Sequence, residues 1–186
     1  IKTLLYKSKK ISTNGIHKMN IKVGSMFPEN SIYLYNDGIM KKTITTSLFS
    51  KKKVIVIGMP GAFTPTCSNY HIPSIIETMS NFKMHGIDEI YCLSINDSYV
   101  MNAWAQNQKL ENVKVIPDGN GDFTDQVDML VEKTNDGFGM RSWRYAAIIN
   151  DGTVEVLFEE PGKQDNNDGD PYSCLLYTSP SPRDWL

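Results

Sequence analysis

The feature that most constrains the fold is a short apolar strand that is followed by a loop and a helix. Residues 54–57 are all Val or Ile, which is typical of a strand buried on both faces of a sheet. Apolar side chains then recur at helical spacing, at Ile72, Ile75, Ile76, Met79 and Phe82. His85 and Gly86 end this pattern, and Pro73 falls near its start, where proline is tolerated or kinks a helix. We therefore expect a central strand connected to a helix by residues 58–71.

Further strands and helices alternate along the chain. Strands are predicted at residues 31–35, 90–95, 113–116, 145–149 and 154–158, and helices at 98–109 and 122–130. Two turn signals, Asn36-Asp37-Gly38 and Asn150-Asp151-Gly152, predict β-hairpins, and Asn96-Asp97-Ser98 predicts a helix cap. Strands that alternate with helices and end in a hairpin indicate an α/β fold. The expected architecture is a thioredoxin-like mixed sheet flanked by helices.

Composition narrows the class of protein. The chain has 186 residues, of which 40% are hydrophobic and 22% charged, and this suits one globular domain. No apolar run reaches the roughly 20 residues of a membrane helix, and a net charge of -2 gives no reason to expect a nucleic-acid partner. Three cysteines without a CxxC pair exclude a zinc ribbon and a thioredoxin-type motif, and the odd number fits a reducing compartment.

The two ends of the chain differ from the rest. Residues 1–28 contain six lysines and no acidic residue, and we interpret residues 1–20 as a disordered leader. This leader is either an organellar transit segment, of plastid or mitochondrial type, or the ordinary arm of a cytoplasmic protein. Residues 21–173 form the predicted domain. Residues 174–186 include Ser-Pro-Ser-Pro, which cannot continue a helix, and we expect this tail to be foreign to the domain.

Cys67 is the residue with the strongest chemical signal. It ends the run Pro-Gly-Ala-Phe-Thr-Pro-Thr-Cys at 60–67 and directly precedes the predicted helix. Unpaired N–H groups and the helix dipole at a helix N-terminus favour a thiolate over a thiol. The alternative is that Cys67 is a buried, inert thiol, as a lone cysteine after a strand usually is. The surrounding Pro, Gly and Thr residues favour a reactive cysteine.

The loop and the residues around it resemble a known family. Residues 58–68, together with His71 and Pro73, closely resemble the active-site loop of the peroxiredoxins of the type-5 or type-II subfamily, apicomplexan antioxidant proteins among them. The resemblance extends through residues 22–24, 92–97 and Arg144, and covers roughly residues 21–173. It implies a thiol peroxidase that reduces hydrogen peroxide and alkyl hydroperoxides through a cysteine sulfenic acid, without haem, flavin or metal.

The resemblance also implies roles for the residues near Cys67. Thr64 would bring its hydroxyl within reach of the sulfur and the peroxide, and Pro60 would shield the thiolate from bulk water. Arg144 would place a permanent cation beside the sulfur, where it favours the thiolate and polarises the peroxide. Three further residues would support the substrate pocket: Gly61, Phe63 and His71.

Several of these residues also allow other interpretations. Arg141 is close enough in sequence to compete with Arg144, and either could be a surface charge at the end of a strand. His71 lies one helical turn beyond the cysteine and would also suit a Cys-His protease, but no oxyanion hole or Asn partner is evident. Phe63 and Phe138 either line an apolar pocket for alkyl peroxides or fill the core.

The other cysteines decide between two catalytic cycles. Cys92 lies among apolar residues and fits a buried structural thiol. Cys174 lies near the position of a resolving cysteine in some type-5 members, but it borders the discordant tail. We therefore favour a one-cysteine cycle, in which external thiols reduce Cys67. The family implies glutathione with glutaredoxin, or thioredoxin, as the reductant, and a homodimer packed through the face that bears the active loop.

Two other classes of function compete with the enzyme. The chain could be a binding or chaperone-like module that kept the fold, although a scaffold has no physical need for Pro60, Thr64, Cys67 and Arg144 together. It could also be a peroxide-sensing relay that passes oxidation to a partner protein. We expect the enzyme.

Overall fold

The computed structural model describes residues 21–36 and 38–172, and its centre is a five-stranded mixed sheet. The sheet has the order β5-β4-β3-β8-β9, with β3 parallel to β4, β4 parallel to β5, and β8 antiparallel to both β3 and β9. Its strands are β3 (Lys53–Gly58), β4 (Glu89–Ser94), β5 (Val113–Pro117), β8 (Tyr145–Asn150) and β9 (Thr153–Glu159). The predicted mixed sheet is confirmed. The predicted leader, tail and Cys174 lie outside the described residues.

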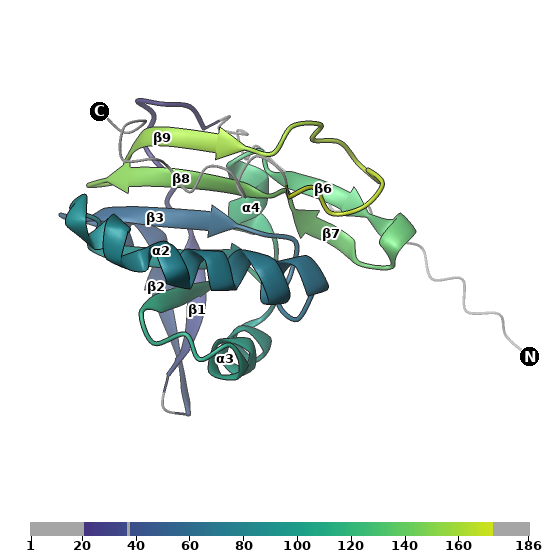
Figure 1. Cartoon of the computed structure of the whole chain (residues 1–186), viewed down its shortest axis with the longest axis horizontal. Coiled ribbons are helices and arrows are strands. Elements are labelled where there is room, and N and C mark those ends of the chain that lie inside the picture. The colour runs from purple at the N-terminus through teal and green to yellow at the C-terminus, as the bar shows by residue number, and fades with distance from the viewer. Residues whose placement is uncertain (1–20, 37, 173–186) are drawn as a thin grey trace, which may run out of the picture.

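The central strand β3 is buried on both faces because its side chains alternate between two apolar clusters. On one face Ile55 and Ile57 join a cluster that includes residues of α2 (Ile72–Met84) and α3 (Ser98–Asn107). On the other face Val54 and Val56 pack with residues of α1 (Thr45–Phe49) and α4 (Asp122–Gln126). Figure 1 shows α2 lying across β3. Helices therefore flank the sheet on both faces, as the thioredoxin-like outline predicts.

Two small hairpins accompany the main sheet. Strands β1 (Ser31–Asn36) and β2 (Ile39–Ile44) form the hairpin that the first turn signal predicts. Strands β6 (Leu130–Lys133) and β7 (Gly139–Ser142) form a second hairpin, joined by the short helix η2 (Thr134–Asp136). In Figure 1 the segment that follows β9 reaches this β6–β7 hairpin. The second hairpin and α1 were not predicted from the sequence.

The helix predicted at residues 122–130 is wrong in its second half. The helix ends at Gln126, and Leu130 already begins β6. The backbone turns sharply at Asp128, which has a φ of +59° that no regular helix contains. Pairing of β6 with β7 then replaces helical hydrogen bonds in satisfying the backbone.

Two predicted local signals are confirmed. The Asp97 side chain accepts hydrogen bonds from the N–H groups of Tyr99 and Val100, and so caps α3. Asp151 and Gly152 both adopt positive φ, of 46° and 82°, which is the geometry of the tight turn between β8 and β9. The sequence signals at these points act locally and therefore predict the structure well.

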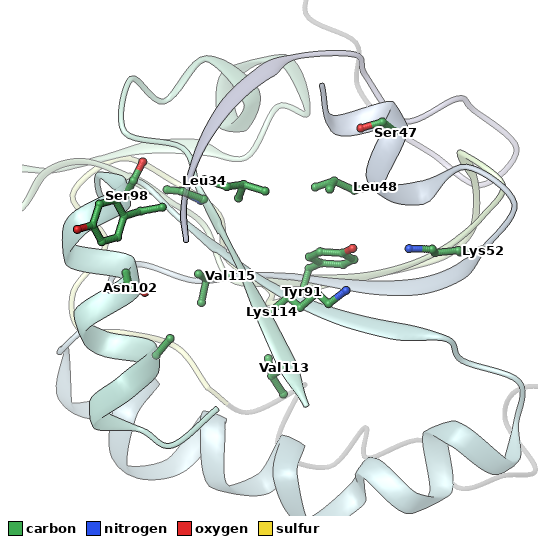
Figure 2. Close-up of a pocket in the computed structure, with 13 residues that line it drawn as sticks. Leu34, Ser47, Leu48, Lys52, Tyr91, Ser98, Asn102, Val113, Lys114 and Val115 are labelled. Carbon is green, nitrogen blue, oxygen red and sulfur yellow. The ribbon is translucent and has the colours of Figure 1, made fainter. Parts of the chain in front are cut away.

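A hollow of about 400 Å³ lies between β1, α1, α3 and the strands β4 and β5 (Figure 2). Apolar side chains such as Leu34, Leu48 and Val115 line it together with Lys52 and Lys114. Both lysines form ion pairs with Glu89, at 3.0 and 2.6 Å, so their charge is already balanced in part. Cys67 does not line this hollow. Among the described residues, no helix is long and apolar enough to cross a membrane.

Gly58 ends β3 against a ring that has no room to move. A Cβ atom at this position would lie 2.0 Å from Cε1 of Tyr145, whose side chain is fully buried. We predict that Gly58→Ala lowers the free energy of unfolding by at least about 2 kcal/mol, because an overpacked core forces side chains off their rotamers. Urea unfolding followed by circular dichroism measures this loss. In a Tyr145→Leu background, Gly58→Ala should lower the free energy of unfolding much less. An equal loss in both backgrounds would show that the Tyr145 ring does not cause it.

Candidate active site

The loop after β3 is fixed by contacts with the neighbouring strand. The N–H of Met59 donates to the carbonyl of Leu93 at 3.0 Å, and the N–H of Ala62 donates to the Oδ1 of Asn96 at 2.9 Å. The loop brings Pro60 and Gly61 into buried positions. Phe63 has a φ of +61°, in the left-handed region that non-glycine residues rarely adopt. The chain therefore turns abruptly before the helix that carries Cys67.

Cys67 lies in the first turn of a continuous helical segment that begins at residue 65, earlier than the sequence predicted, since we expected the helix to start directly after Cys67. Residues 65–66 are α-helical, Cys67–His71 form a π-helical turn (η1), and α2 follows directly. The N–H of Ile72 accordingly donates to the carbonyl of Cys67, five residues earlier. Pro73 offers the physical reason, because in a regular helix its ring clashes with the carbonyl four residues before it. Such widened turns often occur at functional sites.

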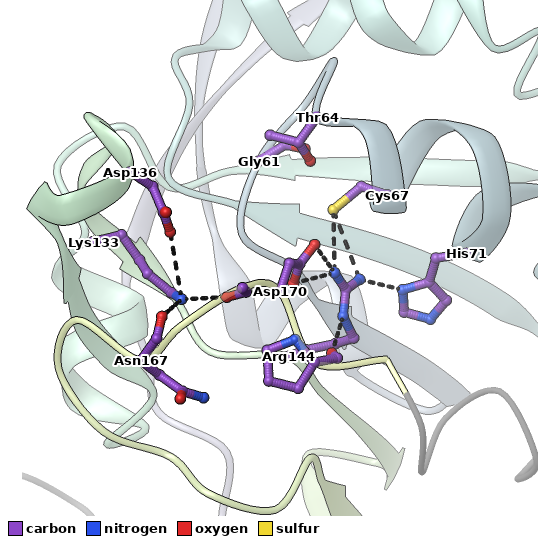
Figure 3. Close-up of polar contacts among 11 residues, drawn as sticks. Gly61, Thr64, Cys67, His71, Lys133, Asp136, Arg144, Asn167 and Asp170 are labelled. Carbon is purple, nitrogen blue, oxygen red and sulfur yellow. Dashed lines mark hydrogen bonds and ion pairs between the residues drawn. The ribbon is translucent and has the colours of Figure 1, made fainter.

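Arg144 reaches the sulfur of Cys67 from the other side of the site. Its Nη1 and Nη2 atoms each lie 3.7 Å from the Sγ of Cys67, and both side chains are buried (Figure 3). The backbone around Arg144 is held by its neighbour Trp143, whose Nε1 donates to the carbonyl of Glu160 at 2.7 Å. The N–H of Glu160 in turn donates to the carbonyl of Arg144 at 3.1 Å. The guanidinium is thus presented to the sulfur from a fixed backbone.

The charge on Arg144 is secured by its surroundings. Burial on its own lowers the pKa of the guanidinium, but the nearby Cys67 and Asp170 charges outweigh it and raise the pKa above its ordinary value. The Nη2 of Arg144 donates to both carboxylate oxygens of Asp170, at 2.6 and 2.5 Å, and its Nε donates to the carbonyl of Pro171 at 3.0 Å. The cation beside the sulfur is therefore permanent.

His71 lies on the same guanidinium and is neutral. Its Nδ1 is 2.8 Å from the Nη1 of Arg144, and since Arg144 only donates, this Nδ1 accepts and the ring proton resides on Nε2. Burial, and secondly the charge of Arg144, lower the pKa of His71 to about 3. The ring also packs against that of Tyr172, with centroids 4.9 Å apart. In this structure His71 supports Arg144 as a hydrogen-bond acceptor.

Thr64 does not make the bond to sulfur that we expected. Its hydroxyl donates to the carbonyl of Gly61 at 2.8 Å, since this carbonyl lies at the loop turn within reach (Figure 3). A hydroxyl has one proton and two lone pairs, so this bond leaves the Thr64 oxygen as an acceptor next to the site. Space at Gly61 is tight, because a Cβ there would lie 3.2 Å from Cγ2 of Thr64 and 3.3 Å from Nη1 of Arg141.

The competing arginine binds backbone carbonyls, and the two phenylalanines are exposed. Arg141 donates from Nη1 to the carbonyl of Ile95 at 3.1 Å and from Nε to that of Phe138 at 3.0 Å, so its donors bind backbone rather than sulfur. Its guanidinium lies over the ring of Phe138, 5.6 Å from the centroid. Phe63 and Phe138 are both exposed, so neither fills the core.

Cys92 is a buried thiol in the same apolar cluster as Cys67. Burial, and to a smaller degree the nearby Cys67, raise its pKa well above the ordinary value, so Cys92 stays protonated. Next to Cys67, the hydroxyl of Ser68 accepts a hydrogen bond at 3.0 Å from the Nε1 of Trp104, which is fully buried. This bond ties the turn that carries Cys67 to α3.

Sequence reasoning missed the residues after β9 that hold Arg144. Asp170, Pro171 and Tyr172 all contact its guanidinium, and the ring of Tyr172 lies 5.3 Å from the Cζ of Arg144. The run Asp-Pro-Tyr has no helical or strand periodicity. The acidic side chain of Asp170 is its one feature that could have indicated a partner for an arginine. Within residues 21–36 and 38–172, no three His, Cys, Asp or Glu side chains are grouped so that they could hold a metal ion.

Comparison with known proteins places this geometry in a family. The family model described as Redoxin matches residues 22–171. A peroxiredoxin of Rhizobium etli is 57% identical over 128 residues, covering 69% of this chain and 72% of the relative. The structure of the Plasmodium falciparum antioxidant protein, a 1-Cys peroxiredoxin, has a TM-score of 0.79 and 37% identity, covering 83% of this chain and 92% of that one. Peroxiredoxin 5 from Alvinella pompejana has a TM-score of 0.69 and 29% identity, covering 76% and 90%.

The chain is a peroxiredoxin. Its relatives and structural neighbours assign it to the type-5 or type-II kind, as the resemblance of the loop implied. It is therefore a thiol-dependent peroxidase, an oxidoreductase with an antioxidant function that acts on a peroxide and draws on a thiol reductant.

The neutral His71 gives the peroxiredoxin a pH-dependent stability. The unfolded chain binds a proton on His71 below its ordinary pKa of 6.5, whereas the folded chain does so only near 3. The contribution of neutral His71 to the free energy of unfolding is therefore complete above pH 6.5. It falls toward pH 3 by up to about 1.4 kcal/mol per pH unit. In His71→Asn, whose Oδ1 still accepts from Arg144, we predict that the loss between pH 7 and pH 4 is smaller by about 3 kcal/mol. Urea unfolding at the two pH values measures this difference.

His85→Asn, the same exchange at an exposed histidine, is the control variant for the substitution itself. An unchanged pH dependence in His71→Asn would mean that His71 is not buried in its neutral form.

Proposed function

We propose that Cys67 is the peroxidatic cysteine of this peroxiredoxin and that Arg144 and Thr64 act with it on the peroxide. The observation that carries the proposal is the contact of two guanidinium nitrogens with one buried sulfur, at 3.7 Å each. A cation at this distance in a buried site stabilises a thiolate strongly, and the helix N-terminus adds unpaired N–H groups. The thiolate is the form that attacks a peroxide.

The proposed reaction is a displacement at oxygen. The Cys67 thiolate attacks the terminal oxygen of the hydroperoxide, an S–O bond forms, and the O–O bond breaks with its electron pair on the leaving oxygen. The sulfur becomes a sulfenic acid and the leaving oxygen takes up a proton to give water or an alcohol. Arg144 stabilises the charge that develops on the leaving oxygen. Thr64, whose own proton is engaged by Gly61, accepts a hydrogen bond from the peroxide hydroxyl and orients it.

The buried loop residues support this reaction by excluding water. Pro60 and Gly61 are buried, and we propose that Pro60 shields the sulfur from bulk water. Phe63 and Phe138 are exposed, and we propose that they offer apolar contact to the organic group of an alkyl hydroperoxide. We therefore include both hydrogen peroxide and alkyl hydroperoxides as substrates.

We further propose a one-cysteine cycle for the return to the thiol. Glutathione condenses with the sulfenic acid and releases water, and a second thiol, from glutathione or glutaredoxin, then frees Cys67 as a new disulfide forms. Support comes from Cys92, which is buried, protonated and thus unfit to resolve the sulfenic acid. Thioredoxin is the alternative reductant, and Cys174 is the resolving cysteine of the alternative two-cysteine cycle.

The assignment of Cys67 is tested by its removal. We predict that Cys67→Ser abolishes peroxide consumption with glutathione and glutaredoxin, whereas Cys92→Ser retains turnover within about threefold of the wild type. Peroxide loss measured in a coupled assay gives both rates. Turnover retained by Cys67→Ser would refute the proposal. Mass spectrometry after one equivalent of peroxide distinguishes glutathione on Cys67 from an intramolecular disulfide with Cys174, and a disulfide would replace the one-cysteine cycle.

The role of Arg144 is tested by a substitution that keeps its charge. Arg144→Lys cannot supply the same fork of donors, so we predict a loss of about 100-fold in the rate constant for oxidation by hydrogen peroxide. Arg141→Lys is the matched control, since Arg141 binds backbone carbonyls, and it should stay within about threefold of the wild type. Stopped-flow kinetics give both rate constants. Equal losses in the two variants would contradict a specific role for Arg144.

A further inference from the structure

Residues 165–172, which we call the strap, contribute three of the five residues described around the guanidinium of Arg144, the other two being Cys67 and His71. Asp170 accepts from Nη2, the carbonyl of Pro171 accepts from Nε, and the ring of Tyr172 lies over the guanidinium. Tyr172 is itself held by Ser74 of α2, with 2.9 Å between the two hydroxyl oxygens. The end of the strap thus connects the arginine to the helix that carries the cysteine.

The start of the strap is fastened to β6 and η2. The N–H of Asn166 donates to the carbonyl of Glu132 at 2.7 Å, and the N–H of Glu132 donates to Oδ1 of Asp165 at 2.8 Å. The Oδ1 of Asn166 accepts from the hydroxyl of Thr134 at 3.0 Å and from the N–H of Asn135 at 3.1 Å. The β6–β7 hairpin therefore serves as the anchor of the strap.

The middle of the strap is held by a buried lysine. Lys133 is only 3% exposed, and its Nζ donates to the carbonyls of Asn167 at 2.7 Å and Gly169 at 2.6 Å (Figure 3). Its carboxylate partner, Asp136, lies at 3.6 Å and its side chain is 39% exposed. A buried ammonium is costly unless its donors are bonded, so Lys133 binds strongly to the two carbonyls that precede Asp170.

We infer that Lys133 and Asp170 are positioning residues for the peroxidase reaction, and that they act by holding the strap and through it the Arg144 guanidinium. The inference rests on the proposed roles of Cys67 and Arg144. Lys133 sets the path of the strap immediately before Asp170, and Asp170 sets the plane of the guanidinium. Two nitrogens can face one sulfur only if that plane is fixed, and small displacements of a catalytic group are costly in rate.

Because Asp170 is charged, two roles for it predict opposite effects on the rate of oxidation: holding the Arg144 guanidinium in position, or acting on the thiolate by its charge. A carboxylate on the guanidinium that contacts the sulfur repels a thiolate and weakens the field of the arginine. If Asp170 acted by its charge alone, its removal would therefore raise the rate of oxidation. If it acts by position, its removal lowers the rate despite the lost repulsion.

Asp170 is tested with Asp170→Ala and Asp170→Asn in the full chain. We expect Asp170→Ala to lower the rate constant for oxidation by hydrogen peroxide about tenfold and to move the pH–rate profile to higher pH. Asp170→Asn keeps one oxygen as an acceptor for Nη2 and should recover much of this loss. Stopped-flow measurements across pH give both readouts. A rate in Asp170→Ala equal to or above that of the wild type would overturn the inference.

Lys133 is tested with Lys133→Met, which keeps the length of the side chain and removes its donors. We expect faster hydrogen exchange in residues 165–172 and a loss of about tenfold in the oxidation rate. Lys114→Met is the matched control, because Lys114 pairs with Glu89 far from the strap, and its rate should equal that of the wild type. A wild-type rate in Lys133→Met, with exchange in the strap increased, would overturn the inference. If Lys133→Met does not fold, the Asp170 variants decide.

These outcomes separate the inference from the proposed function. Turnover by Cys67→Ser would remove the proposed function, and with it the basis of the inference. An inactive Cys67→Ser together with wild-type rates in the strap variants would refute only the inference.

Discussion

The site depends on the guanidinium of Arg144, because every hydrogen-bond donor of this group has a partner. Arg144 has five N–H donors and each has an acceptor: two contact the sulfur of Cys67, and the others bind His71, Asp170 and Pro171. An arginine that is almost fully buried tolerates no unpaired donor, so these partners fix its plane as well as its charge. Because three donors of the guanidinium are bound to His71, Asp170 and Pro171, the remaining two point at the sulfur of Cys67.

His71 and Asp170, two of the partners of Arg144, differ in charge. His71 is neutral, so it accepts from Arg144 without adding a second positive charge to the site. Asp170 adds a negative charge, and by this charge it secures the protonated arginine within a buried setting. The helix contributes as well, since its π-helical turn places Cys67 and His71 on the same side, where both reach one guanidinium.

Local sequence signals predicted most of the fold and the two residues that meet at the centre of the candidate site. The apolar run at 54–57 is the central strand, and the Asp97 cap and the turn at Asp151 and Gly152 lie where the sequence placed them. The loop motif led to Cys67 and Arg144, which the structure brings together. These signals depend on residues close together in the chain, or on a motif specific enough to identify a family.

Most of the features that were missed depend on contacts between distant segments. The half-length of α4 follows from the pairing of β6 with β7, which no local pattern shows. The strap is held by Lys133, a residue whose burial could not be read from a polar surrounding sequence. The bond of Thr64 to Gly61 is local instead, and it depends on how the loop turns. Hydrogen bonds that link residues about 30 positions apart carry no periodicity and no motif.

The most direct test of the account is to locate the first oxidised sulfur. Reduced protein is treated with one equivalent of hydrogen peroxide in the presence of a reagent that traps sulfenic acid, and the modified peptide is identified by mass spectrometry. The account predicts that the trapped sulfenic acid is on Cys67, beside Arg144. A trapped sulfenic acid on Cys92 or Cys174 in place of Cys67 would contradict it.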